Sequence, residues 1–164
     1  MYIVQRSDKT MLWDTFGYNI MMRSDIMELN DVLYEKITNY CNSGDTLYDN
    51  GEYHDAIKMY KKAFEILPEP KEEWEATTWI CSALADAFAE VGETEKSLQY
   101  ALLADKCPNG VMNPYIQLQV GMSFFDIGNK NKAREYLLRA YMLEGEDIFS
   151  DVTSEYFALI QDLI

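Results

Sequence analysis

At 164 residues the chain has the length of one domain, and such a domain buries enough surface to fold without disulfides or a structural metal. Its residues are 48% hydrophobic, and its formal net charge is −14 at pH 7. This charge argues against nucleic acid and anionic membranes as partners, because phosphate contacts need clustered Lys and Arg; a basic protein would be attracted instead. No apolar run approaches the ~18 residues of a membrane span or resembles a signal peptide, so we expect a cytoplasmic protein.

Residues that could carry chemistry are few. The three cysteines show no Cys-x-x-Cys spacing, and the chain has one histidine, so we expect reduced thiols and no metal site. That histidine, His54, has no marked nucleophile or carboxylate partner, and we expect it on the surface. The glycines are scattered and form no phosphate-binding loop. The sequence therefore predicts a protein that is not an enzyme and binds no cofactor.

The N-terminal part divides into an arm and a long helix. Residues 1–24 show no clear period, and we expect either a flexible arm or a segment upstream of a true start at Met21 or Met22. From Ile26 to Leu47, apolar residues recur every three or four positions. Residues 25–28 (Asp-Ile-Met-Glu) have the spacing of a capping box, so the first helix is predicted to begin near residue 25.

Three glycines divide the rest of the chain into units. Gly51, Gly92 and Gly128 lie 41 and 36 residues apart, and each ends an apolar-periodic segment. The extra residues of the first interval fall in 68–74, which we predict to form a loop and a lengthened helix start. The following helix pairs are predicted at 72–91 with 94–106, and at 114–127 with 130–144.

Small and large residues alternate around these glycines in a consistent order. The first unit holds Tyr40, Gly44, Leu47 and Tyr48, then Tyr53, Ala56, Tyr60, Ala63 and Pro68; the second holds Cys81, Leu84, Ala85 and Phe88, then Ser97, Ala101, Ala104 and Pro108; the third holds Val120, Gly121 and Phe124, then Ala133, Leu137 and Ala140. This order resembles the tetratricopeptide repeat, in which small residues lie where paired helices touch. The sequence departs from that pattern in lacking the consensus tryptophan, in Ser97 and in Gly145.

The resemblance implies an all-α fold, an α-solenoid of about three helix-turn-helix repeats. We expect the repeats at residues 37–70, 78–111 and 114–147, within one domain covering 25–164. Beyond them, one apolar stripe comprises Val152, Tyr156, Leu159, Ile160 and Leu163. Because a repeat array needs its apolar end covered, we predict a capping helix over 150–164.

In tetratricopeptide arrays the first helix of each repeat lines a concave binding face. On that face we predict these partner-binding residues: Asp45, Tyr48, Asp49, Trp79, Asp86, Glu90, Tyr115 and Met122. Related domains hold a terminal carboxylate with Lys, Arg and Asn, but here acidic and apolar residues stand instead, so a basic partner is favoured. Two alternatives stay open. The capping helix could cover Tyr115, Leu118, Met122 and Phe125, and the acidic stretch 144–151 could be the binding site.

The last third shows a narrower resemblance. The strings at 113–121 and 139–149, followed by Tyr156-Phe157, are similar to small bacterial tetratricopeptide proteins found beside secreted polymorphic toxins. That resemblance implies an immunity protein whose partner is a basic toxin domain. A tetratricopeptide secretion chaperone and a cytosolic adaptor protein are the alternatives.

Overall fold

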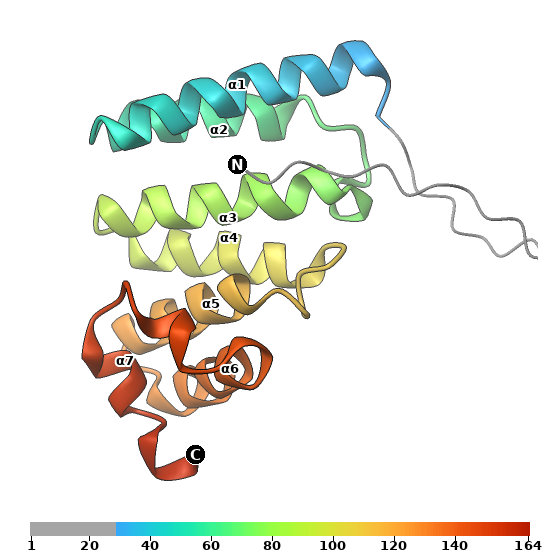
Figure 1. Cartoon of the computed structure of the whole chain (residues 1–164). Helices are drawn as coiled ribbons and strands as arrows, with labels where there is room; N and C mark the ends of the chain where they lie inside the picture. The colour runs from blue at the N-terminus through green and yellow to red at the C-terminus, as the bar shows by residue number, and fades with distance from the viewer. Residues whose placement is uncertain (1–28) are drawn as a thin grey trace, which may run out of the picture.

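The computed structural model describes residues 29–164; the predicted arm at 1–24 and the predicted capping box at 25–28 lie outside these residues. The described chain forms seven α-helices: α1 (Asp31–Asp49), α2 (Tyr53–Glu65), α3 (Glu75–Glu90), α4 (Thr94–Lys106), α5 (Pro114–Asp126), α6 (Lys130–Glu144) and α7 (Ser154–Ala158). Short 3-10 turns lie at Lys71–Glu73, Glu146–Phe149 and Gln161–Leu163, and this part of the chain contains no strand. Helices α1 to α6 stack as three antiparallel pairs (Figure 1), which confirms the all-α solenoid prediction.

Helix α1 begins later than predicted. Asn30 has extended backbone angles, and its side chain accepts a hydrogen bond from the Leu33 amide at 2.9 Å. Asn30 is therefore the N-cap, and the helix starts at Asp31, so the expected start near residue 25 is wrong.

Each pair closes with the same glycine turn. Gly51, Gly92 and Gly128 have φ of +77°, +75° and +83°, a region that side chains disfavour. In the first turn the Glu52 amide donates to the Leu47 carbonyl at 2.8 Å, and equivalent bonds close the other two turns. These are Schellman turns, which end a helix with a residue of positive φ. Because the first helix of each pair ends in such a turn, the three glycines recur with the spacing of the pairs.

Small residues lie where the helices of a pair cross. Gly44 faces the Tyr60 ring, and a Cβ at Gly121 would lie 2.7 Å from Leu137 Cγ. Ala85 and Ala101 are buried at the corresponding place of the middle pair. The packing expected from the repeat pattern is confirmed at these positions.

The interior forms three apolar clusters that follow one another along the stack. The first includes Ile37 and Leu84, the second Ala101 and Ile116, and the third Leu137. The three cysteines are free and buried within or beside these clusters. The core is therefore continuous from α1 to the C-terminal segment.

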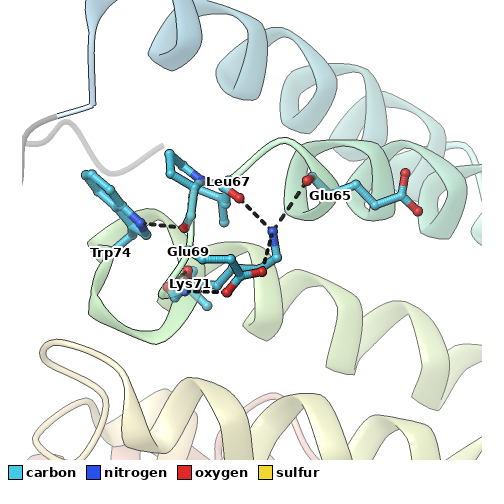
Figure 2. A network of polar contacts seen from close by, with 7 residues as sticks. Glu65, Leu67, Glu69, Lys71 and Trp74 are labelled. Carbon is cyan, nitrogen blue, oxygen red and sulfur yellow. Dashed lines mark hydrogen bonds and ion pairs between the residues drawn. The ribbon is translucent and has the colours of Figure 1, made fainter.

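The extra residues between the first and second pairs form an ordered corner (Figure 2). Trp74 Nε1 donates to the Pro68 carbonyl at 2.8 Å, and Lys71 Nζ donates to the Leu67 carbonyl at 2.6 Å. A 3-10 turn precedes Trp74, and α3 begins at Glu75. A loop was predicted here correctly, but the lengthened helix start was not.

The C-terminal segment covers the third pair without forming one helix. Helix α7 has five residues and is flanked by 3-10 turns. Phe149 and Ile160 are buried in the third cluster, with Val152, Tyr156 and Leu159 packed around them. Leu163 is 48% exposed, so the predicted stripe is right for four of its five residues.

Candidate protein-binding groove

A groove on the α1 and α3 side of the stack brings several predicted site residues together. It is lined by Asp45, Tyr48, Asp49, Tyr60, Ala83 and Asp86. Burial raises the pKa of Tyr48, and the carboxylates of Asp86 and of Glu90, one helical turn beyond it, add to the rise.

Asp86 is the most firmly held carboxylate of the groove. Gln119 Nε2 donates to Asp86 Oδ1 at 2.6 Å, and Tyr115 OH donates to Oδ2 at 3.0 Å. The amide of Gln119 is itself fixed by Ser82, whose carbonyl accepts at 3.0 Å and whose hydroxyl donates at 2.8 Å. Burial raises the pKa of Asp86 to about 6, with Glu90 adding to the rise and the two hydrogen bonds opposing it. This network joins α3 to α5.

A tyrosine also holds an aspartate on each neighbouring first helix. Tyr60 OH donates to Asp45 at 2.8 Å, and Tyr156 OH donates to Asp126 at 3.0 Å. Burial raises the pKa of Asp126. Each first helix thus presents a carboxylate with a fixed direction, and a fixed acceptor loses little freedom when it binds a cation.

The remaining predicted site residues lie partly in the core. Trp79 packs against the first apolar cluster and is only partly exposed. Met122 packs in the third cluster, where the Phe125 ring lies 5.1 Å from that of Tyr156. The alternative in which the C-terminal segment covers this region is therefore right for Met122, Phe125 and the buried Leu118. Tyr115 remains 45% exposed.

Two residues of the site were missed by sequence reasoning, Gln119 and Tyr60. Gln119 is 3% exposed within the apolar run of α5, and Gln117 beside it is fully buried. A polar residue at such a position signals an internal hydrogen-bond network, and this signal was available in the sequence. Tyr60 occupies a packing position of the repeat pattern, and that pattern carries no information about the partner of its hydroxyl.

Charge is separated between the two layers of helices. Helix α1 carries four acidic residues and one lysine, and α3 carries three acidic residues and no basic one. Helix α5 carries one acidic residue and no basic one. Nine of the eleven Lys and Arg residues in the described chain lie on α2, α4 and α6. The ion pairs within residues 29–164 lie outside the groove. The groove is therefore the negative face of a polarised molecule.

The last turns of the first helices concentrate this charge. Asp49, Glu90 and Asp126 occupy them, and none of these turns holds a basic residue. The C-terminus of a helix already carries a partial negative charge, so acidic residues there are unfavourable for folding. The potential at this edge of the groove suits a cationic ligand.

The second acidic region lies on the C-terminal segment. Glu144, Glu146, Asp147 and Asp151 are all exposed, and they surround the turn that leads to α7. None of the four lines the groove that holds Asp86. This rival surface is acidic and exposed.

Two kinds of feature are absent from residues 29–164. No group of three or more His, Cys, Asp or Glu residues in this range is placed to hold a metal ion. None of its helices has the length and apolar character needed to cross a membrane.

Three pairs of antiparallel helices with a groove on the first-helix side define an α-solenoid. Residues 37–70, which form the first pair, match the family model of the tetratricopeptide repeat. The repeat is thus identified at the sequence level in residues 37–70, and the described chain as a whole shares the fold of tetratricopeptide repeat domains. No curated protein sequence matches the chain.

Solved structures share the whole arrangement at low identity. The C-terminal tetratricopeptide domain of a putative FK506-binding protein from Plasmodium falciparum superposes with a TM-score of 0.67 at 19% identity, covering 84% of this chain and 95% of that one. The Yersinia enterocolitica type III secretion chaperone SycD, solved with a peptide of the translocator YopD, gives 0.64 at 12%, covering 82% and 96%. PcrH from Pseudomonas aeruginosa gives 0.62 at 14%, covering 85% and 98%. These likenesses show the fold.

Proposed function

We propose that this chain is a non-catalytic, cytoplasmic binding protein whose acidic groove holds a basic protein partner, and that it acts as an immunity protein against a secreted toxin. The observation that carries the proposal is the separation of charge: the first helices present carboxylates to the groove, and the second helices hold the cations. A protein fold needs no such separation. A basic partner would explain it.

The charge arrangement suits the kinetic task of an immunity protein. Such a protein must capture its toxin quickly, and complementary potentials raise association rates above the ~10⁵–10⁶ M⁻¹s⁻¹ of uncharged pairs. The toxin assignment itself rests on the resemblance of residues 113–121 and 139–149 to immunity proteins. A toxin acting on nucleic acid or nucleotides would be basic, in keeping with an acidic inhibitor.

Co-expression with a candidate toxin domain encoded in a neighbouring reading frame tests the proposal. The wild-type chain should restore growth, and the pair Asp49→Asn with Glu90→Gln should weaken protection, because both residues are exposed at the groove edge. The matched control is Glu144→Gln with Asp147→Asn, which removes the same charge from the C-terminal segment. If only the control pair loses protection, the binding site lies on the C-terminal segment. If the wild-type chain gives no protection, the immunity role is refuted.

Binding kinetics separate the two kinds of groove residue. The Asp49/Glu90 pair should slow association, most strongly at low salt, where the Debye length is about 30 Å at 0.01 M. Tyr48→Ala and Trp79→Ala should instead raise the dissociation rate, since aromatic anchors typically contribute at least ~2 kcal/mol. Unchanged dissociation for both would mean that these aromatic residues do not contact the partner.

A secretion chaperone is the second candidate, favoured by the fold shared with SycD and PcrH. A chaperone would bind an extended segment of its client, whereas an immunity protein would bind a folded toxin domain. Titrating the chain with the folded domain and with its unfolded fragments distinguishes the two. Tight binding only to the folded form supports immunity, and binding to short fragments supports the chaperone.

A further inference from the structure

The connection between α4 and α5 exposes apolar side chains beside the groove. Met112 is 71% exposed and Val111 57%, and Tyr115, on the first turn of α5, is 45% exposed. Scattered exposed apolar residues are ordinary, but three within five positions form a patch. We define Val111, Met112 and Tyr115 as the apolar patch.

The loop that carries this patch is held in one conformation. The Asn113 amide donates to the Gly110 carbonyl at 3.0 Å, and the side chain of the fully buried Gln117 donates to the same oxygen at 3.3 Å. Thr78 Oγ1 on α3 donates to the Pro108 carbonyl at 2.8 Å. Val111 and Met112 are thus exposed by a fixed loop, which reduces the ordering cost of any contact they make.

The apolar patch continues into the acidic groove through Tyr115. Its ring belongs to the patch, while its hydroxyl donates to Asp86 at 3.0 Å. The patch lies where α5 begins, and the acidic last turns lie where the first helices end. In Figure 1 the α4–α5 connection projects from the side of the stack opposite to the short glycine turns. A 13-residue helix such as α5 is about 20 Å long at 1.5 Å per residue.

We propose that the binding surface has two parts: the partner presents one aliphatic or aromatic side chain to the Val111 and Met112 end of the apolar patch, before α5 begins, and a cluster of Lys or Arg, roughly one length of α5 (about 20 Å) further along, to Asp49 and Glu90 at the far ends of α1 and α3. The proposal rests on the proposed function of the groove. An amphipathic basic helix of about 13 residues has the required reach. Met112 suits this role because a flexible thioether side chain adapts to different apolar groups.

Designed peptides test the two-part surface on the full chain. The probes are 16-residue alanine-based helices with four lysines at one end and either leucine or alanine near the other end. Each peptide is made in two versions, with the lysines at the N-terminal end or at the C-terminal end. Fluorescence anisotropy gives their Kd values for the wild type. The leucine peptide should bind roughly tenfold more tightly than its alanine counterpart, since one buried leucine contributes roughly 1.5 kcal/mol and about 1.4 kcal/mol corresponds to a tenfold change in Kd.

Protein variants locate the two contacts. Met112→Ser should remove the advantage of the leucine peptide and leave the alanine peptide unchanged. The matched control is Met142→Ser, because Met142 is 77% exposed on α6, in the other layer of helices, and should affect neither peptide. Asp49→Asn with Glu90→Gln should weaken both peptides. Circular dichroism verifies that the variants keep their helices.

The outcomes separate this inference from the function on which it rests. If lysine peptides bind through Asp49 and Glu90 but leucine brings no gain, or Met112→Ser and Met142→Ser behave alike, the apolar part is refuted and the acidic groove stands. If no peptide binds in a manner sensitive to Asp49 and Glu90, both proposals fall.

Discussion

At the scale of single residues, Asp86 links α3 to α5 through hydrogen bonds, and its negative charge is unfavourable for folding because the carboxylate is buried. Burial raises its pKa to about 6, from an ordinary value of 3.8. The carboxylates and phenols facing it are Glu90 on its own helix, Tyr48 on α1 and Tyr115 on α5. At neutral pH the ionised group costs stability, because the unfolded chain ionises it more easily.

The first prediction is a pH dependence that Asp86→Asn removes. Between pH 3.8 and about 6 the folded chain binds more protons at this site than the unfolded chain, so its contribution to stability falls as pH rises through that window. Asp86→Asn should therefore raise the free energy of unfolding at pH 7 relative to wild type, by up to roughly 3 kcal/mol, since a tenfold change in a protonation constant corresponds to about 1.4 kcal/mol.

Urea unfolding at pH 4, 5, 6 and 7 measures this effect. Asn can accept from Gln119 and donate to Tyr115, so the link between α3 and α5 survives the substitution. Asp55→Asn is the control, since the pKa of Asp55, an exposed residue, is lowered by Lys58 and its contribution has the opposite sign. If the stability of Asp86→Asn follows the same pH profile as that of the wild type, ionisation of Asp86 does not lower the stability of the folded chain.

Gly121 gives the second prediction, on packing. A Cβ there would lie 3.0 Å from the backbone nitrogen of Leu137 and 2.7 Å from its side chain, so α5 and α6 must move apart. Gly121→Ala should destabilise the chain by roughly 1–3 kcal/mol despite the better helix propensity of alanine. Thermal unfolding checks this, and Leu137→Ala in the same chain should reduce the penalty of the glycine substitution. An additive double variant would mean that the crossing is looser than described.

Sequence spacing predicted where small residues and carboxylates lie, and it could not predict what holds the carboxylates. The position of Gly121 follows from its distance to the turn glycine Gly128, because both belong to one local pattern. The partner of Asp86 is Gln119, 33 residues away, and its choice depends on how α5 rotates against α3. Such a rotation is fixed by core packing between repeats, which no local pattern encodes.

At the scale of elements, the glycine turns made the paired helices predictable to within a few residues, and the two ends were predicted poorly. Asn30 and Asp25 are both good N-cap residues, and spacing alone did not select Asn30. At the other end, Ser150, Asp151 and Thr153 lie between the 3-10 turn and α7 and interrupt the single helix that the apolar stripe suggested. An apolar stripe in the sequence predicts which side chains pack in the core. It does not determine whether those side chains lie on one continuous helix or on several short turns.

The third prediction is that the C-terminal segment stabilises the third pair through Ile160. This residue is fully buried against α5 and α6, whereas Leu163, three residues later, is 48% exposed. Ile160→Ala should lower the free energy of unfolding by about 2–5 kcal/mol, and Leu163→Ala should change it by less than about 0.5 kcal/mol. Chemical denaturation compares the two. Equal effects would show that the segment does not cap the array.

At the scale of the whole molecule, the groove face combines acidic side chains with the negative ends of three helices. Composition determines the sign of the net charge, and the repeat resemblance predicts which face binds a partner. The separation between layers became visible only when the helix bounds were known, because it depends on which lysines lie on α2, α4 and α6. An arrangement that is unfavourable for folding and complementary to a ligand is typical of a functional site.

The last prediction compares two identical substitutions at opposite ends of α3. Glu75 lies in its first turn, where the helix dipole favours a carboxylate, and Glu90 is its last residue, where the dipole opposes one. Glu75→Gln should therefore lower the free energy of unfolding and Glu90→Gln should raise it, each by roughly 0.3–1 kcal/mol at low salt. Because both residues are exposed, 0.5 M NaCl should shrink both changes. Glu90→Gln should at the same time weaken binding of the lysine peptides, while Glu75→Gln should not. A variant that gains stability and loses affinity would identify Glu90 as a residue kept for binding. Loss of stability in both variants, or a gain at Glu90 with unchanged peptide affinity, would remove it from the binding site.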